Sequence, residues 1–181
     1  MKRWTSFAMM QEDLSKNAVS GIVMTIGNFD GFHLGHQKLI KRVKQLSNEH
    51  GWLAVVVTFQ EHTSLVLGTQ PPLLLMSVEE RCQSFANQGM DGALLLEFTP
   101  EVAKITAESF LEKLVSLGVK ALVVGHDFTF GAGGAGDTTL VVQYMQEKGL
   151  YGEVIPPVKY RGKIVCSSQV RELLLRGRLA E

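Results

Sequence analysis

A glycine-rich stretch between an expected strand and an expected helix constrains this chain most. It reads Thr-Ile-Gly-Asn-Phe-Asp-Gly-Phe-His-Leu-Gly-His over residues 25–36. The apolar, β-branched residues 21–26 before it predict a buried strand. The apolar residues after it repeat at helical spacing: Leu39, Ile40, Val43 and Leu46. The stretch is therefore a strand-to-helix turn, which places a flexible backbone and free N–H groups at a helix N-terminus.

Two histidines, His33 and His36, close this turn. Helix N-terminal N–H groups and imidazole donors together suit the stabilisation of negative charge on a phosphoryl group. The pair could also be half of a metal site, but zinc needs further ligands, and Cys82 and Cys166 are too far apart in the sequence to form a ligand pair. Two unrelated surface histidines are the other alternative. Only five histidines occur in the chain, so two in one turn favour phosphate chemistry.

A second element of this kind lies near the C-terminus. Ser167 and Ser168 come directly before a predicted helix over residues 169–177, and Arg171 lies within its first turn. Hydroxyls and a guanidinium at a helix start can bind phosphate oxygens. Ordinary serine capping beside a surface arginine gives the same pattern, but the histidine turn favours the phosphate interpretation.

Strands and helices alternate through the rest of the chain, which predicts an α/β fold. We expect a sheet of about five mainly parallel strands with helices on both faces. A short edge strand is also predicted near residues 6–10. The other strands are predicted at residues 52–59, 93–98, 119–124 and 151–155, and the intervening helices lie between residues 77–89, 106–118 and 137–149.

Composition limits the function classes. The 181 residues predict a single domain over 1–181. Eighteen basic and eighteen acidic residues cancel, so no charge pattern predicts binding to nucleic acid or a membrane surface. No apolar run reaches the length of a membrane span. Two cysteines without a pairing framework indicate a reducing compartment, and we expect a cytoplasmic protein.

The turn at residues 25–36 resembles the signature of the FMN adenylyltransferase (FAD synthetase) module of bacterial bifunctional riboflavin kinase/FAD synthetases. That module is part of the His-x-Gly-His nucleotidyltransferase superfamily, and Gly-Asn-Phe-Asp-Gly at residues 27–31 is similar to its flavin branch. Residues 124–137 and 166–171 resemble two further motifs of the family, in the same order. The resemblance implies a Rossmann-like nucleotidyltransferase fold.

The resemblance also implies a reaction, in which the FMN phosphate attacks the α-phosphorus of ATP in line and gives FAD and pyrophosphate. His33 and His36 would donate to the α-phosphate, and Ser168 and Arg171 would act on the leaving phosphates. Mg²⁺ would sit on the triphosphate, with no direct side-chain ligand. The implied ATP-binding residues are Gly27, Asn28, Phe29, Asp30, Gly31, Gly35, Ser167, Ser168 and Arg171.

The implied FMN-binding residues are Phe59, His62, Asp127, Phe128 and Phe130. Alternatives stay open: His62 could be an ordinary loop histidine, and the two phenylalanines after Asp127 could be hydrophobic plugs under a loop.

The chain departs from the family pattern at three positions. Glu61 and Thr63 replace prolines in the loop after the second expected strand, and Cys166 replaces a serine. These departures predict a more flexible loop and lower activity. They leave open two other functions: a catalytically weak flavin- or nucleotide-binding module, and a His-x-Gly-His transferase with another phosphate acceptor.

Two further expectations concern neighbouring functions. Gly131, Gly133 and Gly136 spell a dinucleotide-binding fingerprint, but six residues separate them from the strand, so we do not predict an NAD or FAD Rossmann site. No riboflavin kinase sequence follows within residues 1–181. A riboflavin kinase domain or enzyme that supplies FMN is therefore the expected partner.

Overall fold

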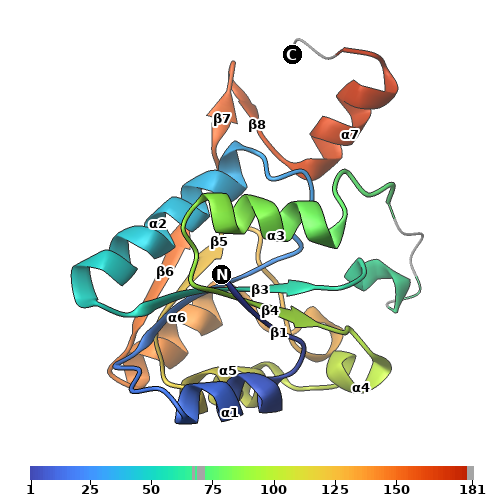
Figure 1. Cartoon of the computed structure of the whole chain (residues 1–181). Helices are drawn as coiled ribbons and strands as arrows, with labels where there is room; N and C mark the ends of the chain where they lie inside the picture. Colours follow the sequence, from blue (N-terminus) through green and yellow to red (C-terminus); the bar gives the residue numbers. More distant parts are fainter. Residues whose placement is uncertain (67, 69–71, 179–181) are drawn as a thin grey trace.

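A six-stranded sheet forms the centre of the computed structural model, which describes residues 1–66, 68 and 72–178 (Figure 1). Its strand order is β1-β4-β3-β2-β5-β6, and every neighbouring pair is parallel. The strands are β1 (Lys2–Trp4), β2 (Ile22–Ile26), β3 (Leu53–Phe59), β4 (Gly92–Leu96), β5 (Val119–Gly125) and β6 (Tyr151–Ile155).

Helices connect the strands and continue beyond the sheet. The α-helices are α1 (Phe7–Ser15), α2 (Leu34–His50), α3 (Val78–Asn87), α4 (Pro100–Ala103), α5 (Ala107–Ser116), α6 (Thr138–Glu147) and α7 (Ser167–Leu175). Two 3₁₀ turns are η1 (Thr63–Leu65) and η2 (Ala132–Gly134). A small antiparallel hairpin of β7 (Lys159–Tyr160) and β8 (Lys163–Ile164) precedes α7.

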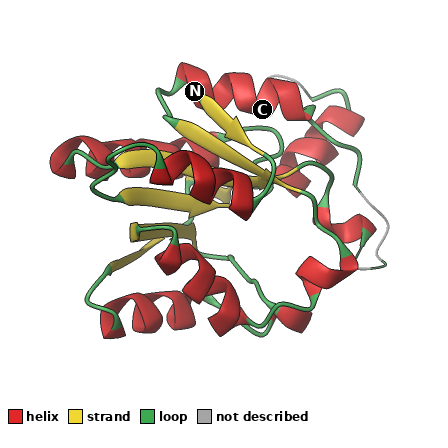
Figure 2. Cartoon of the chain, turned by 60° about the horizontal axis from the view of Figure 1, so that its bottom comes forward, coloured by secondary structure: helices red, strands yellow, loops and turns green. Residues whose placement is uncertain are grey.

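The sheet is covered on both faces (Figures 1 and 2). Apolar residues of α2 and α3 form one core with one side of the strands, and residues of α1, α5 and α6 form a second core with the other side. All five residues of β2 are buried, with Met24 in one core and Val23 in the other. A strand buried on both faces explains why its sequence is a continuous apolar run instead of an alternating one.

The strand order places a topological switch point beside β2. From β2 the chain continues through α2 to β3 on one side, while β5 pairs with the other side of β2. The loops that leave β2 and β5 diverge at the carboxyl edge of the sheet, and this crevice is where open α/β sheets bind ligands. The predicted phosphate turn therefore lies where the topology favours a site.

The predicted fold class is confirmed, with one strand more than expected. Strand β1 pairs with β4 at the sheet edge and buries Trp4. The prediction of a strand near residues 6–10 is wrong, because this segment opens helix α1. Ser6 caps that helix by accepting a hydrogen bond from the backbone N–H of Met9 at 3.1 Å, and this cap outweighs the weak strand pattern.

Candidate active site

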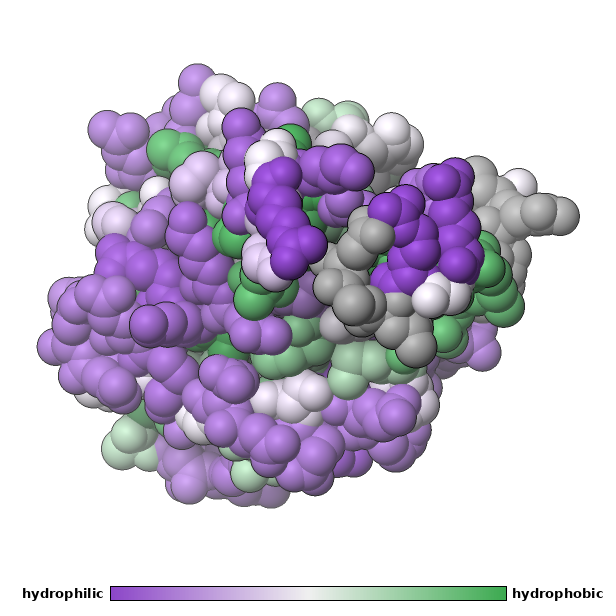
Figure 3. Space-filling model, turned by 90° about the horizontal axis from the view of Figure 1, so that it is seen from above, coloured by the Kyte–Doolittle hydropathy of each residue, from purple (hydrophilic) through white to green (hydrophobic). Residues whose placement is uncertain are grey.

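A cavity of about 950 Å³ opens at the carboxyl edge of the sheet. Every site residue predicted from the sequence lines it, except Gly31. The two phosphate-type elements, from the turn after β2 and the start of α7, thus share one cavity. Seen from the side of α7 and the hairpin, the surface is mostly hydrophilic with apolar residues between (Figure 3).

His33 is held by the helix that it caps. Its Nδ1 accepts a hydrogen bond from the backbone N–H of Gly35 at 3.2 Å. A Cβ atom at Gly35 would lie 3.1 Å from the His33 ring, so this glycine makes room for the imidazole. Because Nδ1 accepts, the proton of the neutral ring is on Nε2, which can donate to a ligand.

His36 lies deeper in the same turn. Its ring stacks on His33 with centroids 3.7 Å apart and lies 5.2 Å from the ring of Phe29. Burial, with a smaller contribution from His33, lowers the pKa of His36 to about 3. Burial also lowers the pKa of His33, against the opposing charges of Asp127 and Asp30. Both rings are therefore neutral hydrogen-bond donors near pH 7 when no ligand is bound.

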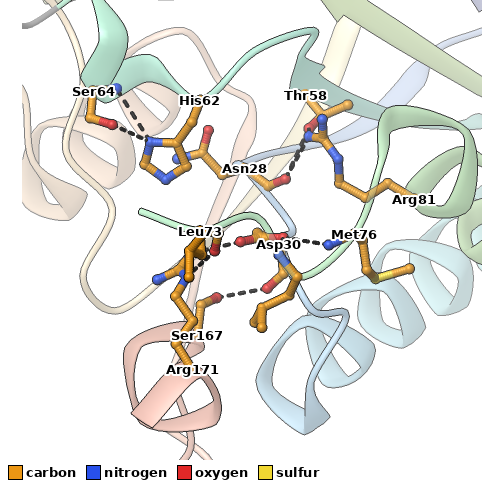
Figure 4. A network of polar contacts seen from close by, with 11 residues as sticks. Asn28, Asp30, Thr58, His62, Ser64, Leu73, Met76, Arg81, Ser167 and Arg171 are labelled. Carbon is orange, nitrogen blue, oxygen red and sulfur yellow. Dashed lines mark hydrogen bonds and ion pairs between the residues drawn. The ribbon is translucent and has the colours of Figure 1, made fainter. Parts of the chain in front are cut away.

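Asp30 joins three segments around the cavity (Figure 4). Its Oδ2 accepts from Nη2 of Arg171 at 2.6 Å, and its Oδ1 accepts from the backbone N–H groups of Leu75 and Met76 at 2.8 and 3.0 Å. The hydroxyl of Ser167 donates to the Asp30 carbonyl at 2.7 Å. Asp30 is only 3% exposed. Its carboxylate thus ties the turn to the segment before α3 and to α7, which is a structural role.

Arg171 is already paired in this structure. Besides its ion pair with Asp30, its Nε donates to the carbonyl of Leu73 at 2.8 Å. None of the nine residues of α7, all of which the structure describes, is buried. The contacts of Ser167 and Arg171 therefore attach an otherwise peripheral helix to the cavity. Its first residue, Ser167, is hydrogen-bonded to Asp30 of the turn that carries the two histidines.

Two motif residues, Gly31 and Cys166, differ from the other motif residues in their contacts. Gly31 is not among the residues that line the cavity; its φ is +83°, and a Cβ there would lie 2.6 Å from Cδ1 of Leu75. It is needed for the turn itself. Cys166 is the N-cap of α7 and lines the cavity, but its side chain makes no capping hydrogen bond. Helix α7 begins at Ser167, two residues earlier than predicted.

Aromatic pairs also line the cavity. Phe128 and Phe130 stack with centroids 5.2 Å apart, and Phe59 meets Phe98 edge to face at 5.4 Å. Nδ1 of His62 lies 2.7 Å from the hydroxyl oxygen of Ser64. Burial, followed by the charge of Arg171, lowers the pKa of His62. These residues offer flat apolar walls and one neutral imidazole to a ligand in the cavity. The loop that carries His62 extends to Pro72, and residues 67 and 69–71 of it lie outside the described residues.

The glycine fingerprint at residues 131–136 has a packing role. A Cβ at Gly131 would lie 2.7 Å from the backbone N of Ala107, and one at Gly136 would lie 2.7 Å from its Cβ. These glycines let the loop after β5 lie against the start of α5. They do not form the first βα turn of a dinucleotide site.

Arg81 was not predicted from the sequence; it is buried and contacts the backbone of Asn28 and Phe59, which line the cavity. A signal was present: residues 78, 81, 82 and 85 share one helical face, and all but Arg81 are apolar. Among the described residues, no cluster of three or more histidine, cysteine or acidic side chains could hold a metal. In the same part of the chain, no helix is long and apolar enough to cross a membrane.

Residues 15–169 match a sequence family described as FAD synthetase. The chain belongs to the FAD synthetase family. The bifunctional riboflavin kinase/FMN adenylyltransferase of Listeria monocytogenes is 32% identical over 162 residues, which cover 88% of this chain and 51% of that protein. This FAD synthetase domain thus spans about half the length of the curated relatives that it matches.

Solved structures support the same fold for the FAD synthetase domain. A protein described as a macrolide-efflux protein from Streptococcus pneumoniae superposes with a TM-score of 0.78 at 26% identity, over 93% of this chain and 55% of that one. Pantoate-beta-alanine ligase from Francisella tularensis superposes with a TM-score of 0.61 at 15% identity, over 96% of this chain and 73% of that one. The second likeness concerns the fold alone and agrees with the parallel α/β architecture described above.

Proposed function

We propose that this chain transfers the adenylyl group of ATP to FMN and produces FAD and pyrophosphate. Family membership supports the reaction class. The observation that carries the proposal is the meeting of His33 and His36 with Ser168 and Arg171 in one cavity. A triphosphate that spans these two elements would have its α-phosphate at the histidines and its terminal phosphates at α7.

In the proposed reaction, a phosphate oxygen of FMN forms a bond to the α-phosphorus as the bond from that phosphorus to the bridging oxygen of the β-phosphate breaks. Pyrophosphate leaves with the electron pair, and no covalent enzyme intermediate is needed. Catalysis then consists chiefly of positioning and charge stabilisation. His33, whose Nδ1 is occupied by Gly35, presents Nε2–H to the α-phosphate. His36 adds a second neutral donor beside it.

The leaving pyrophosphate is held at α7. Backbone N–H groups at a helix N-terminus and serine hydroxyls bind phosphate oxygens, and Ser168 lines the cavity there. The ion pair with Asp30 fixes the guanidinium of Arg171 before ATP arrives. A pre-oriented cation costs less reorganisation when negative charge develops on the leaving group.

Magnesium fits this site as a companion of the triphosphate. Asp30 and Asp127 are the carboxylates that line the cavity in the described part of the chain. Asp30 is engaged by Arg171, whereas the Asp127 side chain is 78% exposed. One open carboxylate suits Mg²⁺, which keeps waters and takes substrate phosphates as ligands. When bound, the cation would neutralise triphosphate charge, and Asp127 would hold it, which replaces the expectation from the sequence that no side chain is a direct ligand.

In this proposal the flavin would lie against the aromatic residues of the cavity lining. Phe59, Phe128 and Phe130 offer apolar faces to an isoalloxazine ring, and His62 offers a polar edge. The curated relatives are named as bifunctional with riboflavin kinase. We infer that a riboflavin kinase activity supplies the FMN.

The test is direct. Purified protein is mixed with ATP, Mg²⁺ and FMN, and FAD and pyrophosphate are measured by chromatography and a coupled assay. Parallel reactions replace FMN with pantetheine phosphate or nicotinamide mononucleotide. Formation of FAD from FMN, with no turnover of the other two acceptors, supports the proposal. Turnover of another acceptor in its place, or tight flavin binding without pyrophosphate release, would reject it.

A further inference from the structure

Arg81 is a cation in the interior, 4% exposed, and it contacts Asn28 and Phe59, which line the cavity (Figure 4). Its hydrogen-bond partners among the described residues are neutral oxygens. Nη1 donates to the carbonyl of Asn28 and to the hydroxyl of Thr58, both at 2.8 Å. Nη2 donates to the carbonyls of Phe59 at 2.9 Å and Gln60 at 3.5 Å. The guanidinium thus makes a fork over backbone oxygens.

These acceptors belong to the ends of two neighbouring strands. Asn28 follows the end of β2, and Phe59 ends β3. The hydroxyl of Thr58 also donates to the carbonyl of Asn28 at 3.2 Å, which closes a small network between the strands. Beyond Asn28 the chain leads to the histidine turn, and beyond Phe59 it leads to His62. One side chain therefore fixes both exits from the sheet.

Packing alone does not account for a charge at this position. The neighbours of Arg81 on the buried face of α3 are apolar, including Cys82 and Phe85. Desolvation of a cation is unfavourable, and apolar replacements of buried charges are often tolerated. Burial lowers the pKa of Arg81, and the charge of Asp30 opposes this shift. The atom Nε has no hydrogen-bond partner among the described residues, so the site tolerates an imperfectly satisfied group.

We propose that Arg81 is a positioning residue for adenylyl transfer, which sets the spacing between the histidine turn after β2 and the flavin-side loop after β3. This inference rests on the proposed function. The turn would hold the α-phosphate, and the loop would hold the flavin. In-line attack depends on the alignment of two separately held substrates. Loss of the hydrogen bonds from Arg81 to the ends of β2 and β3 should therefore affect the transfer step more than the binding of either substrate.

The experiment compares Arg81→Met and Arg81→Lys with a matched control, Arg42→Met. Arg42 joins α2 to β6 through Glu153 at 2.7 Å and does not line the cavity. In Arg81→Met, kcat falls about 10²-fold, the scale of a misplacement near 1 Å, while Kd for ATP alone and FMN alone changes less than about 3-fold. Arg81→Lys keeps the charge without the fork and gives an intermediate kcat. Arg42→Met keeps its kcat per folded molecule.

A second readout does not need turnover. Hydrogen exchange of Arg81→Met is measured by mass spectrometry, and exchange rises in segments 27–31 and 59–64 while β2 and β3 stay protected. If Arg81→Met does not fold, Thr58→Val removes one arm of the network and gives the same pattern at smaller size. Equal kcat in the Arg81 and Arg42 variants, or unchanged exchange in both segments, overturns the inference. If the wild type makes no FAD, the proposed function fails. The exchange measurement still shows whether Arg81 holds the segments after β2 and β3 in place.

Discussion

Replacing His36 with alanine is expected to lower kcat for FAD formation by about 10²–10³, the usual cost of one donor to a developing charge. Its ring lines the cavity beside His33, where it can donate to the α-phosphate. ATP binding should persist, because in the proposed binding mode the N-terminus of α7 would still hold the terminal phosphates. Steady-state kinetics and an ATP titration separate the two effects.

A matched control for this change is His50→Ala. His50 ends α2 and stacks on Trp52 with centroids 4.2 Å apart, away from the cavity. Its removal should leave kcat unchanged. If His36→Ala turned over FMN at the wild-type rate, the donor role of the histidine turn would be rejected.

Acid sensitivity of the fold should depend on His36. Its pKa is about 3 in the folded chain and 6.5 without burial. Between these values the unfolded chain binds a proton that the folded chain does not, so the free energy of unfolding falls as pH decreases, by up to about 1.4 kcal/mol per pH unit from this group. Urea titrations from pH 4.5 to 7 should show a smaller slope for His36→Asn than for the wild type. Equal slopes would show that the ring is not buried as described.

Residue patterns in the sequence could identify the histidines but not the partner of Arg171. The sequence predicts a free arginine for the phosphates, whereas Arg171 pairs with Asp30, 141 residues earlier in the chain. Two residues so far apart in the sequence form no local pattern from which their ion pair could be predicted. Gly31 stays a predicted ATP-binding residue, and its positive φ adds a second reason for a glycine there, which is the turn itself.

At the scale of elements, α7 depends on its attachment through Asp30. The Asp30→Asn variant can still accept from Leu75 and Met76 but loses the charge that holds Arg171. The side chains of Asp30 and Arg171 are 4% and 15% exposed. We expect a loss of about 3 kcal/mol in the free energy of unfolding, the lower end for breaking a buried pair. Trypsin should also cleave faster after Arg176 at the end of α7.

The control for this variant is Glu172→Gln, which breaks the pair between Glu172 and Arg176 at 2.6 Å on the surface of the same helix. Exposed pairs of this kind contribute little. The free energy of unfolding of the protein and the rate of trypsin cleavage in α7 should therefore hardly change. A cost for Asp30→Asn no larger than that of Glu172→Gln would mean that the pair does not attach the helix.

Elements with strong local signals were predictable, and short ones were not. Ser77 and Glu80 form a capping box at the start of α3, which explains why the helix predicted from residue 77 was found. The apolar runs of β2 and β3 were found because they are buried on both faces. Strand β1 has three residues, of which only Trp4 is buried. It exists because it pairs with β4, and no periodicity within three residues can indicate that.

On the scale of the whole molecule, the strand order unites segments that the sequence keeps apart. The histidine turn follows β2, the loop with Phe128 and Phe130 follows β5, and α7 is the last helix of the described chain. The parallel arrangement brings the carboxyl ends of β2 and β5 together. The sequence could predict each segment and, from the topology of parallel sheets, their common edge. The cavity itself required the strand order.

A single cavity for both substrates makes a prediction about the product. FAD contains the adenylyl group and the flavin together, so it should occupy the proposed nucleotide and flavin positions of the 950 Å³ cavity at once. We expect FAD to displace bound ATP and bound FMN, and a non-hydrolysable ATP analogue to displace ATP alone. Flavin fluorescence reports FMN release, and radiolabelled ATP reports the nucleotide. FAD that displaced FMN and left ATP bound would place the two substrates in separate sites. Simultaneous displacement would follow from the shared cavity, because one molecule then fills the space between the histidines and the aromatic walls.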